Sequence, residues 1–324
     1  MGPDLKRVLV VDPIDAGAEE VLARVAELVR APDSAPETIR RLARDVDGII
    51  TRSKLPDDVF DRAPRLRAVA IHGTGTDLVP LAAATRRGAM VSNVPGGNAQ
   101  SVAEYCVMAM LVLARQTLPI TNFLKTRDWD TARALGAGTH EIAGKTLGIV
   151  GVGHIGGRLA KICRDGFGMT VLGHQRRLDR LPPQAEPAAL EELLARSDFV
   201  VAVCPLTPET HHLFDDRRIG RMKKSAWLIN AGRGPVVEEE ALVRALKEKR
   251  IAGAMLDVYE HYRLEPGHPL LSLDNAVLTP HLAGMTVEAR ARVGVVAAEE
   301  LARMLGGEPP RSWVNPLTSK ERSA

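Results

Sequence analysis

The sequence predicts an α/β protein with two domains, each built on a doubly wound parallel sheet. Short apolar runs alternate with longer amphipathic stretches, which is the pattern of strands and helices in βα units. A long apolar stretch at residues 98–115 divides this alternation into two series, and a chain of 324 residues suffices for two domains. A glycine-rich turn stands between a strand and a helix at the start of the second series.

The first series runs from the N-terminus to the long apolar stretch. Residues 7–11, 46–51 and 66–71 are short apolar runs, and we expect them to be buried strands. Apolar residues recur with helical spacing over residues 16–30, which predicts one helix. A glycine-rich turn at residues 72–77 follows the third strand.

Two segments separate the series. Residues 98–115 predict a helix that is apolar on all sides, so we expect it to be buried on all sides and to lie between the domains. Residues 129–142 contain glycine and show no clear period. We expect them to form an irregular excursion that reaches a partner subunit.

The second series supplies the remaining elements. It predicts strands at residues 146–150, 170–173, 198–203, 226–230, 253–257 and 276–279, and helices at residues 156–164, 191–195, 238–249 and 286–305. Because long helices flank this series, we expect residues 99–281 to form one domain. Residues 1–98 would form the other domain, completed by the C-terminal residues 282–324.

The sharpest local motif is the glycine loop at residues 151–156, which reads Gly-Val-Gly-His-Ile-Gly and lies between a predicted strand and a predicted helix. Gly151 permits the tight turn, Gly153 lets the backbone approach a pyrophosphate, and Gly156 lets helix and strand pack closely. The helix N-terminus attracts the anion. The motif predicts a dinucleotide-binding Rossmann domain over residues 99–281. The cofactor-binding residues expected in the loop are Gly151, Gly153, His154, Ile155 and Gly156.

The end of the next strand selects between the two nicotinamide cofactors. An acidic residue there would bond the ribose 2′-hydroxyl of NAD. Gln175 stands in that place, and Arg176 and Arg177 follow. A carboxylate would repel a 2′-phosphate, whereas guanidinium groups bind it in a fork. The sequence therefore favours NADPH (NADP) and leaves NAD as the second choice. The alternative is that the two arginines belong to a solvated charged turn.

Composition argues against several classes of function. Lys and Arg number 43 against 40 Asp and Glu, and only 3% of residues are aromatic, so we expect no nucleic-acid partner. No apolar run reaches the ~18–20 residues of a membrane span, and a strand-like run follows the N-terminus almost directly. We therefore expect no membrane partner and no signal peptide. The three cysteines are too scattered for a disulfide framework or a zinc cluster, which predicts no metal and a cytoplasmic protein.

Eight segments together resemble one family over essentially the whole chain. They are TRS at 51–53, HGTGTD at 72–77, NVPGGNAQSVAE at 93–104, the glycine loop, CPLTP at 204–208, LINAGRG at 228–234, LDV at 256–258 and LTPHLAG at 278–284. In this order and spacing the chain resembles the D-isomer-specific 2-hydroxyacid dehydrogenases, which include phosphoglycerate dehydrogenase and glyoxylate/hydroxypyruvate reductase. The resemblance implies two Rossmann-like domains, of which the substrate domain is flavodoxin-like. It also implies D-stereospecific hydride transfer between NAD(P) and a small 2-oxo or 2-hydroxy acid.

The resemblance also implies roles for matching positions. The substrate-binding positions would be Arg52, Ser53, Gly73, Thr74, Gly75 and Asn98. Residues 73–75 would offer backbone N–H groups to the substrate carboxylate. Further cofactor-binding positions, on the adenine and nicotinamide sides, would be Pro205, Leu206, Thr207, Asn230, Ala231, Gly232, Asp257 and Val102.

The chemistry of a 2-oxo acid supports two catalytic residues at positions that the resemblance also marks. The substrate presents a carboxylate next to a carbonyl, and a bidentate Arg233 would neutralise and orient this pair. Reduction requires a proton on the carbonyl oxygen, which His281 can supply near neutral pH. The alternative for Arg233 is a residue of a surface turn, and the alternative for any single histidine is a structural or solvated role.

The expected partner of the catalytic histidine departs from the family pattern. The family has a glutamate five residues after the aspartate that corresponds to Asp257, and counting without a gap puts Tyr262 there. A phenol accepts a hydrogen bond from imidazole but brings no charge, so we expect the protonated histidine to be less stabilised. The alternatives are Glu260 and Glu265, the latter requiring a three-residue insertion and a later deletion.

The leading prediction is an NADP-preferring 2-oxoacid reductase for substrates such as glyoxylate and hydroxypyruvate. The alternative is a non-catalytic, dinucleotide-sensing binding protein of the C-terminal-binding-protein type. The missing glutamate favours this alternative, whereas the intact Arg233 and His281 oppose it. Because residues 98–115 and 129–142 carry more apolar surface than a monomer hides, we expect a C₂ homodimer.

Overall fold

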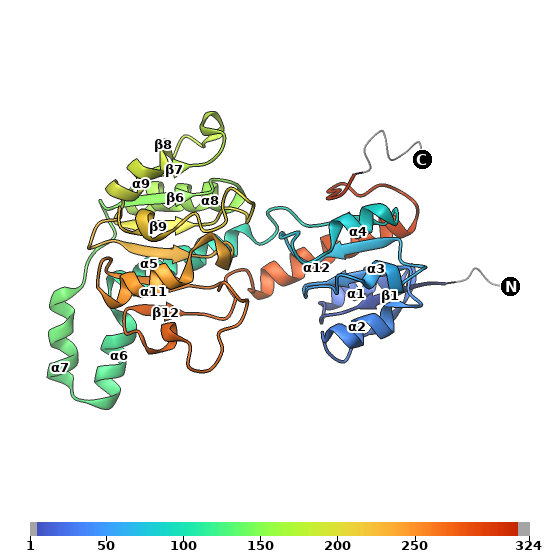
Figure 1. The fold of residues 1–324 in the computed structure, drawn as a ribbon, viewed down its shortest axis with the longest axis horizontal. Helices are drawn as coiled ribbons and strands as arrows, with labels where there is room; N and C mark the ends of the chain where they lie inside the picture. The colour runs from blue at the N-terminus through green and yellow to red at the C-terminus, as the bar shows by residue number, and fades with distance from the viewer. Residues whose placement is uncertain (1–4, 317–324) are drawn as a thin grey trace. The chain divides into compact units, whose positions relative to one another are not determined.

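The computed structural model describes residues 5–316, and the chain divides into two compact α/β units (Figure 1). The first unit comprises Met1–Asn98 and Met285–Ala324, and the second comprises Ala99–Gly284. Each unit has its own parallel sheet and its own hydrophobic core. The predicted α/β fold class with two parallel sheets is therefore confirmed.

The sheet of the first unit has five parallel strands in the order β2-β1-β3-β4-β5. The strands are β1 Lys6–Val10, β2 Ala26–Arg30, β3 Gly48–Thr51, β4 Ala68–Ile71 and β5 Met90–Ser92. This is the strand order of flavodoxin-like sheets, in which the winding reverses between β1 and β3. Ligands of such sheets bind outside the carboxyl ends of the strands at that point.

Helices cover both faces of this sheet because its strands are apolar on both sides. One face carries α1 (Ala16–Ala23) and α12 (Val287–Leu305), and the other carries α2 (Pro36–Ala43), α3 (Val59–Arg62) and α4 (Leu81–Arg86). Thr286 caps α12 by accepting a hydrogen bond from the Ala289 N–H. Through α12, the C-terminal part of the chain becomes part of the first unit.

The predicted helix at residues 16–30 is wrong in its second half. Helix α1 ends at Ala23, and Ala26–Arg30 forms the edge strand β2, which pairs in parallel with β1. Val25, Leu28 and Val29 continue the helical spacing of the apolar residues before them, so the periodicity could not separate the two elements. Pairing with β1 decides the conformation, and that pairing is a tertiary contact.

The sheet of the second unit has seven parallel strands in the order β12-β11-β10-β9-β6-β7-β8. The strands are β6 Thr146–Val150, β7 Thr170–His174, β8 Glu186–Pro187, β9 Phe199–Ala202, β10 Trp227–Asn230, β11 Gly253–Leu256 and β12 Ala276–Leu278. This is a Rossmann order extended by one strand, and the winding reverses between β6 and β9. A dinucleotide is expected outside the carboxyl ends of these two strands.

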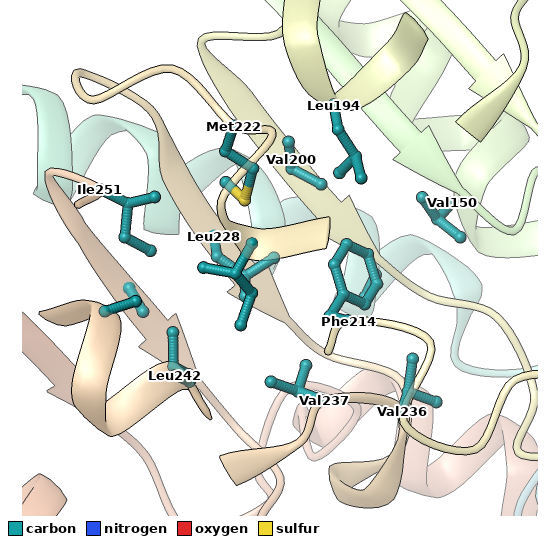
Figure 2. Close-up of a cluster of buried hydrophobic side chains, with 14 of the residues drawn as sticks. Val150, Leu194, Val200, Phe214, Met222, Leu228, Val236, Val237, Leu242 and Ile251 are labelled. Atoms are coloured by element: carbon teal, nitrogen blue, oxygen red, sulfur yellow. The ribbon is translucent and has the colours of Figure 1, made fainter. Parts of the chain in front are cut away.

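Two hydrophobic layers enclose the second sheet. One contains α5 (Ala99–Ala114) and α8 (His154–Lys161), and the other contains α9 (Leu190–Arg196), α10 (Asp216–Ile219) and α11 (Glu239–Lys247). Figure 2 shows part of the second layer, in which Phe214, Val236 and Val237 are buried together. Val236 and Val237 lie three and four residues after Arg233, and their burial fixes the loop after β10 close to that residue.

The predicted burial of the long helix on all sides is wrong for a single chain. Met108 and Leu111 on α5 are 42% and 37% exposed. The rest of the helix packs on α8, β10 and β11 within the second unit. Among the described residues, no single helix is long and apolar enough to cross a membrane, although α5 and the next helix pass that test together as a pair bent by 55°.

The predicted irregular conformation of residues 129–142 is wrong for residues 129–138, which form α7 (Trp129–Ala134) and a 3₁₀ turn (Leu135–Gly138), and its reach to a partner subunit stays a prediction. Helix α6 (Thr117–Thr126) precedes this segment, and α6 and α7 form a hairpin (Figure 1). Asp128 caps α7 by accepting a hydrogen bond from the Thr131 N–H. These helices are too short to show a clear apolar period, which is why the sequence pattern missed them.

Candidate active site

The glycine loop joins β6 to α8, and its three glycines meet three different steric demands. Gly151 has a φ of +99°, and a Cβ there would lie 2.5 Å from the Cys204 backbone nitrogen. A Cβ on Gly156 would lie 2.5 Å from the Gly151 carbonyl oxygen, so only glycine lets α8 pack this close. A Cβ on Gly153 would meet nothing within 4 Å, which leaves its backbone open to a pyrophosphate. The loop therefore fits a dinucleotide.

The N-terminus of α8 adds a positive electrostatic potential at the glycine loop. The helix begins at His154, and no side chain caps its first N–H groups. His154 is exposed and Ile155 is half-buried. Uncapped N–H groups and the helix dipole together favour an anion.

The predicted catalytic and cofactor residues of the second unit follow the carboxyl ends of six strands. They are residues 151–156 after β6, 175–177 after β7, 205–207 after β9, Asn230 at the end of β10 with residues 231–233 after it, Asp257 and Tyr262 after β11, and His281 after β12. Because parallel strands end at one edge of a sheet, these segments line that edge. Val102 is the exception, since it is 4% exposed on α5 and packs into the core.

The turn after β7 carries the arginines expected to read the cofactor ribose. Gln175 Nε2 donates a hydrogen bond to the Arg177 carbonyl at 2.8 Å. Arg177 also pairs with Asp179 at 3.4 Å, and both side chains are more than half exposed. An exposed ion pair of this kind contributes about 0–1 kcal/mol to stability, so a cofactor phosphate could displace Asp179 from Arg177.

The loop after β9 lies beside the same turn. Pro205 and Leu206 are exposed, and the Thr207 N–H donates to Thr210 Oγ1 at 2.7 Å. A hydrogen bond from Thr207 lowers the pKa of the Glu209 carboxyl, and the charge of Arg176 lowers it further. Arg176 therefore has an acidic neighbour in Glu209, as Arg177 has in Asp179.

The turn after β10 is shaped to present Arg233. Asn230 is buried, and its amide donates to the Arg233 carbonyl at 3.0 Å and accepts from the Gly232 N–H at 3.1 Å. Any Cβ on Gly234 would overlap the Tyr259 carbonyl, so the backbone passes this point only as glycine. The Arg233 guanidinium is half-buried and donates to the Gly232 carbonyl at 2.9 Å.

Asp257 anchors the loop that carries His281. Its carboxylate is buried and accepts three hydrogen bonds, from Thr279 Oγ1 at 2.7 Å and from the N–H groups of Leu282 and Ala283 at 2.8 Å. Its carbonyl accepts from the His281 N–H at 2.8 Å. The expected contact between Asp257 and the nicotinamide ribose stays a prediction, because both carboxylate oxygens already serve this loop.

Two tyrosines complete the support of this loop, and the sequence reasoning missed both. Tyr105 shares a hydrogen bond of 2.6 Å with Thr279 Oγ1, and the Tyr259 hydroxyl donates to the Thr279 carbonyl at 2.8 Å. Burial raises the pKa of Tyr105 above its ordinary value and that of Tyr259 to about 12. Both phenols therefore remain protonated and can donate throughout the physiological range.

The structure brings Tyr262 to His281. Their ring centroids lie 5.9 Å apart with the planes at 75°, an edge contact. Both residues have left-handed backbones, with φ of +51° and +54°, and both side chains face solvent in the second unit. The catalytic role of the pair stays a prediction.

The structure does not support Glu260 as the partner of His281. Its carboxylate accepts from His212 Nε2 at 2.8 Å and from the Glu239 N–H at 3.4 Å. Burial raises the pKa of Glu260, but these hydrogen bonds outweigh burial and lower it overall. Glu265 is exposed, and its carbonyl accepts from the His268 N–H at 3.0 Å.

In the first unit, Asp12 organises the predicted substrate-binding turn after β3. Its Oδ2 accepts from the N–H groups of Arg52 and Ser53 at 2.7 and 2.9 Å, and its Oδ1 accepts from Ser53 Oγ at 2.7 Å. The sequence reasoning did not identify Asp12. An aspartate two residues after the end of β1, where the winding of the sheet reverses, was the available signal.

The glycine-rich turn after β4 corrects one predicted role. The Gly73 N–H donates to the Ile71 carbonyl at 2.8 Å, so it is not available to a substrate carboxylate. Within residues 5–316, the N–H groups of Thr74 and Gly75 have no hydrogen-bond partner and remain available. Thr74 Oγ1 lies 3.2 Å from Asn98 Oδ1, which joins two of the predicted residues.

A buried histidine also lies at this edge. His72 follows β4, and its Nε2 lies 3.2 Å from the Arg290 carbonyl oxygen. Burial lowers the pKa of His72, although the Arg290 carbonyl partly opposes that shift. The ring is therefore neutral near pH 7, with its proton on Nε2. In the described part of the chain, no group of three or more His, Cys, Asp or Glu residues could hold a metal ion.

Comparison with known proteins identifies the family. The family described as D-isomer specific 2-hydroxyacid dehydrogenase, NAD binding domain, matches residues 107–283. A glyoxylate reductase of Thermofilum pendens is 40% identical over 298 residues, covering 90% of this chain and 87% of that protein. The chain belongs to the D-isomer-specific 2-hydroxyacid dehydrogenase family. The resemblance inferred from the motifs is thus confirmed.

Other relatives differ in length and in cofactor. A D-3-phosphoglycerate dehydrogenase of Methanocaldococcus jannaschii is 36% identical, and the match covers 95% of this chain but only 59% of that protein. An NADPH-dependent glyoxylate/hydroxypyruvate reductase from Sinorhizobium meliloti, solved with NADP and malonate, has a TM-score of 0.84 at 28% identity and covers 96% of this chain and 97% of that chain. An NAD-dependent formate dehydrogenase from Staphylococcus aureus, solved with NAD, has a TM-score of 0.83 at 28% identity and covers 97% and 98%.

Family membership makes this chain an oxidoreductase of 2-hydroxy acids that uses a nicotinamide dinucleotide. Relatives of the same fold use either NAD or NADP. The family therefore leaves the preferred cofactor and the substrate to be argued from the residues.

Proposed function

We propose that the protein is an NADPH-preferring 2-oxoacid reductase that converts a small acid of the glyoxylate or hydroxypyruvate type into the corresponding 2-hydroxy acid, with D configuration wherever the product has a stereocentre. The observation that carries the proposal is the placement of Arg233, Asp257 and His281 after β10, β11 and β12, three neighbouring strands of the second sheet. These residues share an edge with the glycine loop, which fits the cofactor that the reaction needs.

Each residue has a distinct part in the proposed reaction. Bound NAD(P)H supplies the hydride. Arg233 binds the substrate carboxylate and carbonyl oxygen and so fixes the carbonyl carbon for attack. His281 donates a proton from its imidazole to the carbonyl oxygen as charge develops there. Asp257 holds the loop of His281 through the hydrogen bonds described above, which keeps the imidazole in one place.

The cofactor preference rests on the turn after β7. Gln175 carries no charge, so it does not repel a 2′-phosphate, and two exposed arginines follow it. The acidic neighbours Asp179 and Glu209 compete for those arginines but are themselves exposed, and exposed ion pairs are weak. We therefore propose NADPH as the preferred cofactor and NADH as the poorer one.

The first unit, residues 1–98 and 285–324, is the proposed substrate domain, and the second unit, residues 99–284, is the proposed dinucleotide domain. The sequence predicts the second boundary three residues earlier, after residue 281. The available N–H groups of Thr74 and Gly75 suit a carboxylate, and Arg52 adds positive charge nearby. The Asp12 carboxylate holds the turn after β3 by accepting a hydrogen bond from the Arg52 backbone N–H. This arrangement supports a role for the turns after β3 and β4 in binding an acid.

We propose that the protein is a cytoplasmic C₂ homodimer assembled through the second unit. Five large apolar side chains on α5, α6 and α7 are 37–65% exposed in the single chain, and they are Met108, Leu111, Leu118, Leu124 and Trp129. Burying them against a second copy would remove this apolar surface from water. The three cysteines are free and buried, as in a reducing compartment.

A second candidate is a dinucleotide-sensing binding protein of the C-terminal-binding-protein type that does not turn over substrate. Tyr262 in the position of the usual glutamate favours it, because a phenol brings no charge to stabilise imidazolium. An enzyme oxidises NADPH when a 2-oxo acid is added, whereas a sensor binds NADPH without oxidising it, so one assay separates the two candidates.

The experiment is steady-state oxidation of NADPH and of NADH with a panel of 2-oxo acids that includes glyoxylate, hydroxypyruvate and pyruvate. We expect turnover with the small acids and a higher kcat/KM for NADPH, with Arg233→Gln purified in parallel as the control for contaminating reductases. Chiral analysis of a product such as glycerate or lactate tests the D configuration. Tight NADPH binding without turnover on any acid would favour the sensor.

A further inference from the structure

A network of two glutamates and two histidines holds the segment that follows β11. Glu260 Oε1 accepts from His212 Nε2 at 2.8 Å, and Glu239 Oε1 lies 3.0 Å from His268 Nε2. Each glutamate also accepts from the other's backbone: the Glu239 N–H donates to Glu260 Oε2 at 3.4 Å, and the Glu260 N–H donates to Glu239 Oε2 at 3.3 Å. The four side chains are 12–34% exposed, so these bonds are partly shielded from water.

The network fixes both ends of a segment that is otherwise solvent-exposed. Residues 261–267 are exposed except for the half-buried Leu264. Glu239 contacts the start of this segment at Glu260 and its end at His268. Tyr262 lies between these two points, with 65% of its surface exposed, and its ring contacts His281. The ring contact therefore depends on how the two ends are held.

Backbone conformation marks the same residues. Of the five described non-glycine residues with positive φ, three are His212 at +49°, Tyr262 at +51° and His281 at +54°. A left-handed conformation is unfavourable for residues other than glycine. Such strain persists only where the surroundings enforce it, and it clusters at functional sites. The hydrogen bonds of the network enforce it at His212 and around Tyr262.

The network also reaches the turn that presents the substrate-binding arginine. The His212 N–H donates to the Pro235 carbonyl at 2.8 Å, two residues beyond Arg233. The segments after β9, β10 and β11 are thereby tied together by His212 and Glu260. The reaction proposed above gives none of these side chains a direct part.

We propose that Glu260 and Glu239, with their histidine partners, are positioning residues that hold Tyr262 against His281. The catalytic meaning of that contact rests on the proposed function, whereas the contact itself does not. Without either glutamate the segment loses an attachment at one end or both, and Tyr262 leaves the imidazole. Turnover then falls because His281 loses the ring that orients it.

The test uses fluorine NMR of the full chain labelled with 3-fluorotyrosine. The chain has three tyrosines, so the spectrum holds three resonances, and Tyr262→Phe assigns one of them. His281→Gln is expected to shift the Tyr262 resonance because the two rings are in contact. In a Glu260→Ala background, His281→Gln is expected to cause no further shift. The resonance of the buried Tyr105 reports whether the fold is intact.

The matched control is Glu192→Gln, which removes an exposed helical ion pair with Arg196 and should leave the response of Tyr262 unchanged. A Tyr262 resonance that responds to His281→Gln equally with and without Glu260 would overturn the proposal. If Glu260→Ala displaces the Tyr105 resonance, His212→Ala removes the same bond from the other side and decides the question in the same way.

Kinetics give a second readout. Glu260→Ala and Tyr262→Ala should each lower kcat at least about tenfold, and the double variant should be no slower than the slower single variant. If the kcat losses of the two single variants multiply in the double variant, Glu260 acts elsewhere and the proposal is overturned. A wild-type protein that reduces no 2-oxo acid would refute the proposed function only, because the fluorine response is measured without substrate.

Discussion

Asp257→Asn changes the carboxylate that holds the loop of His281 and preserves its size. In the wild type, Oδ1 accepts from Thr279 Oγ1 and the Leu282 N–H, and Oδ2 accepts from the Ala283 N–H, all within 2.7–2.8 Å. An asparagine can keep the two bonds at Oδ1 through its amide oxygen. Its NH₂ group then faces the Ala283 N–H, so two donors oppose each other in a buried place.

The expected magnitude follows from these contacts. A hydrogen bond to a charged acceptor contributes roughly 1.5–3 kcal/mol, and a buried donor without a partner costs about 1–3 kcal/mol. We expect Asp257→Asn to lower the free energy of unfolding of the second unit by about 2–5 kcal/mol. A displacement of the imidazole by about 1 Å is expected to lower kcat by about 10²-fold.

The assay combines urea unfolding followed by circular dichroism with steady-state reduction of glyoxylate by NADPH. Asp165→Asn, which removes only an exposed ion pair with Lys161, is the matched control. A lower kcat with an unchanged KM for NADPH means that Asp257 acts through the loop. A raised KM for NADPH means that it also contacts the cofactor. Stability and kcat both equal to those of the wild type would refute the reasoning.

Three further predictions address the cofactor, the catalytic pair and pH. The double variant Arg176→Ala/Arg177→Ala should weaken NADPH binding by about one to two decades in Kd per lost contact and leave NADH binding nearly unchanged, since each charged hydrogen bond is worth roughly 1.5–3 kcal/mol. Equal losses of affinity for both cofactors, measured by fluorescence titration, would contradict this prediction. Tyr262→Glu should move the alkaline limb of the kcat/KM profile to higher pH, because a carboxylate stabilises the protonated His281 that reduction requires; a limb that does not move would contradict the pairing. Burial lowers the pKa of His72 from its ordinary 6.5, so the folded protein binds that proton more weakly than the unfolded chain does. Stability should therefore fall as the pH drops below 6.5, and thermal melts of His72→Gln should lose part of that dependence; identical pH dependence in the two proteins would contradict the assignment.

The fold was predictable because its strongest signals are local. The glycine loop lies between a strand and a helix, and the steric contacts of Gly151 and Gly156 explain why glycine is needed at both positions. The edge strand β2 was not predictable, because residues 26–30 continue the apolar spacing of α1 and form a strand only by pairing with β1. Short helices such as α6 and α7 have the same difficulty, since few turns give little periodicity.

The candidate site was predictable where a motif names the residue and unpredictable where a distant contact gives it a role. Tyr262 could be placed by counting from Asp257, and the structure puts its ring beside His281. The pairing of Glu260 with His212 joins residues 48 positions apart in the sequence. The hydrogen bond that occupies the Gly73 N–H was equally hidden, because it depends on the local backbone path.

The most direct test of the central claim is the kcat for glyoxylate reduction by His281→Ala, measured beside the Kd for NADPH of the same variant. If His281 donates the proton, kcat falls by about 10²–10⁴-fold and the Kd for NADPH stays at the wild-type value. A kcat equal to that of the wild type, with NADPH bound normally, would contradict the account.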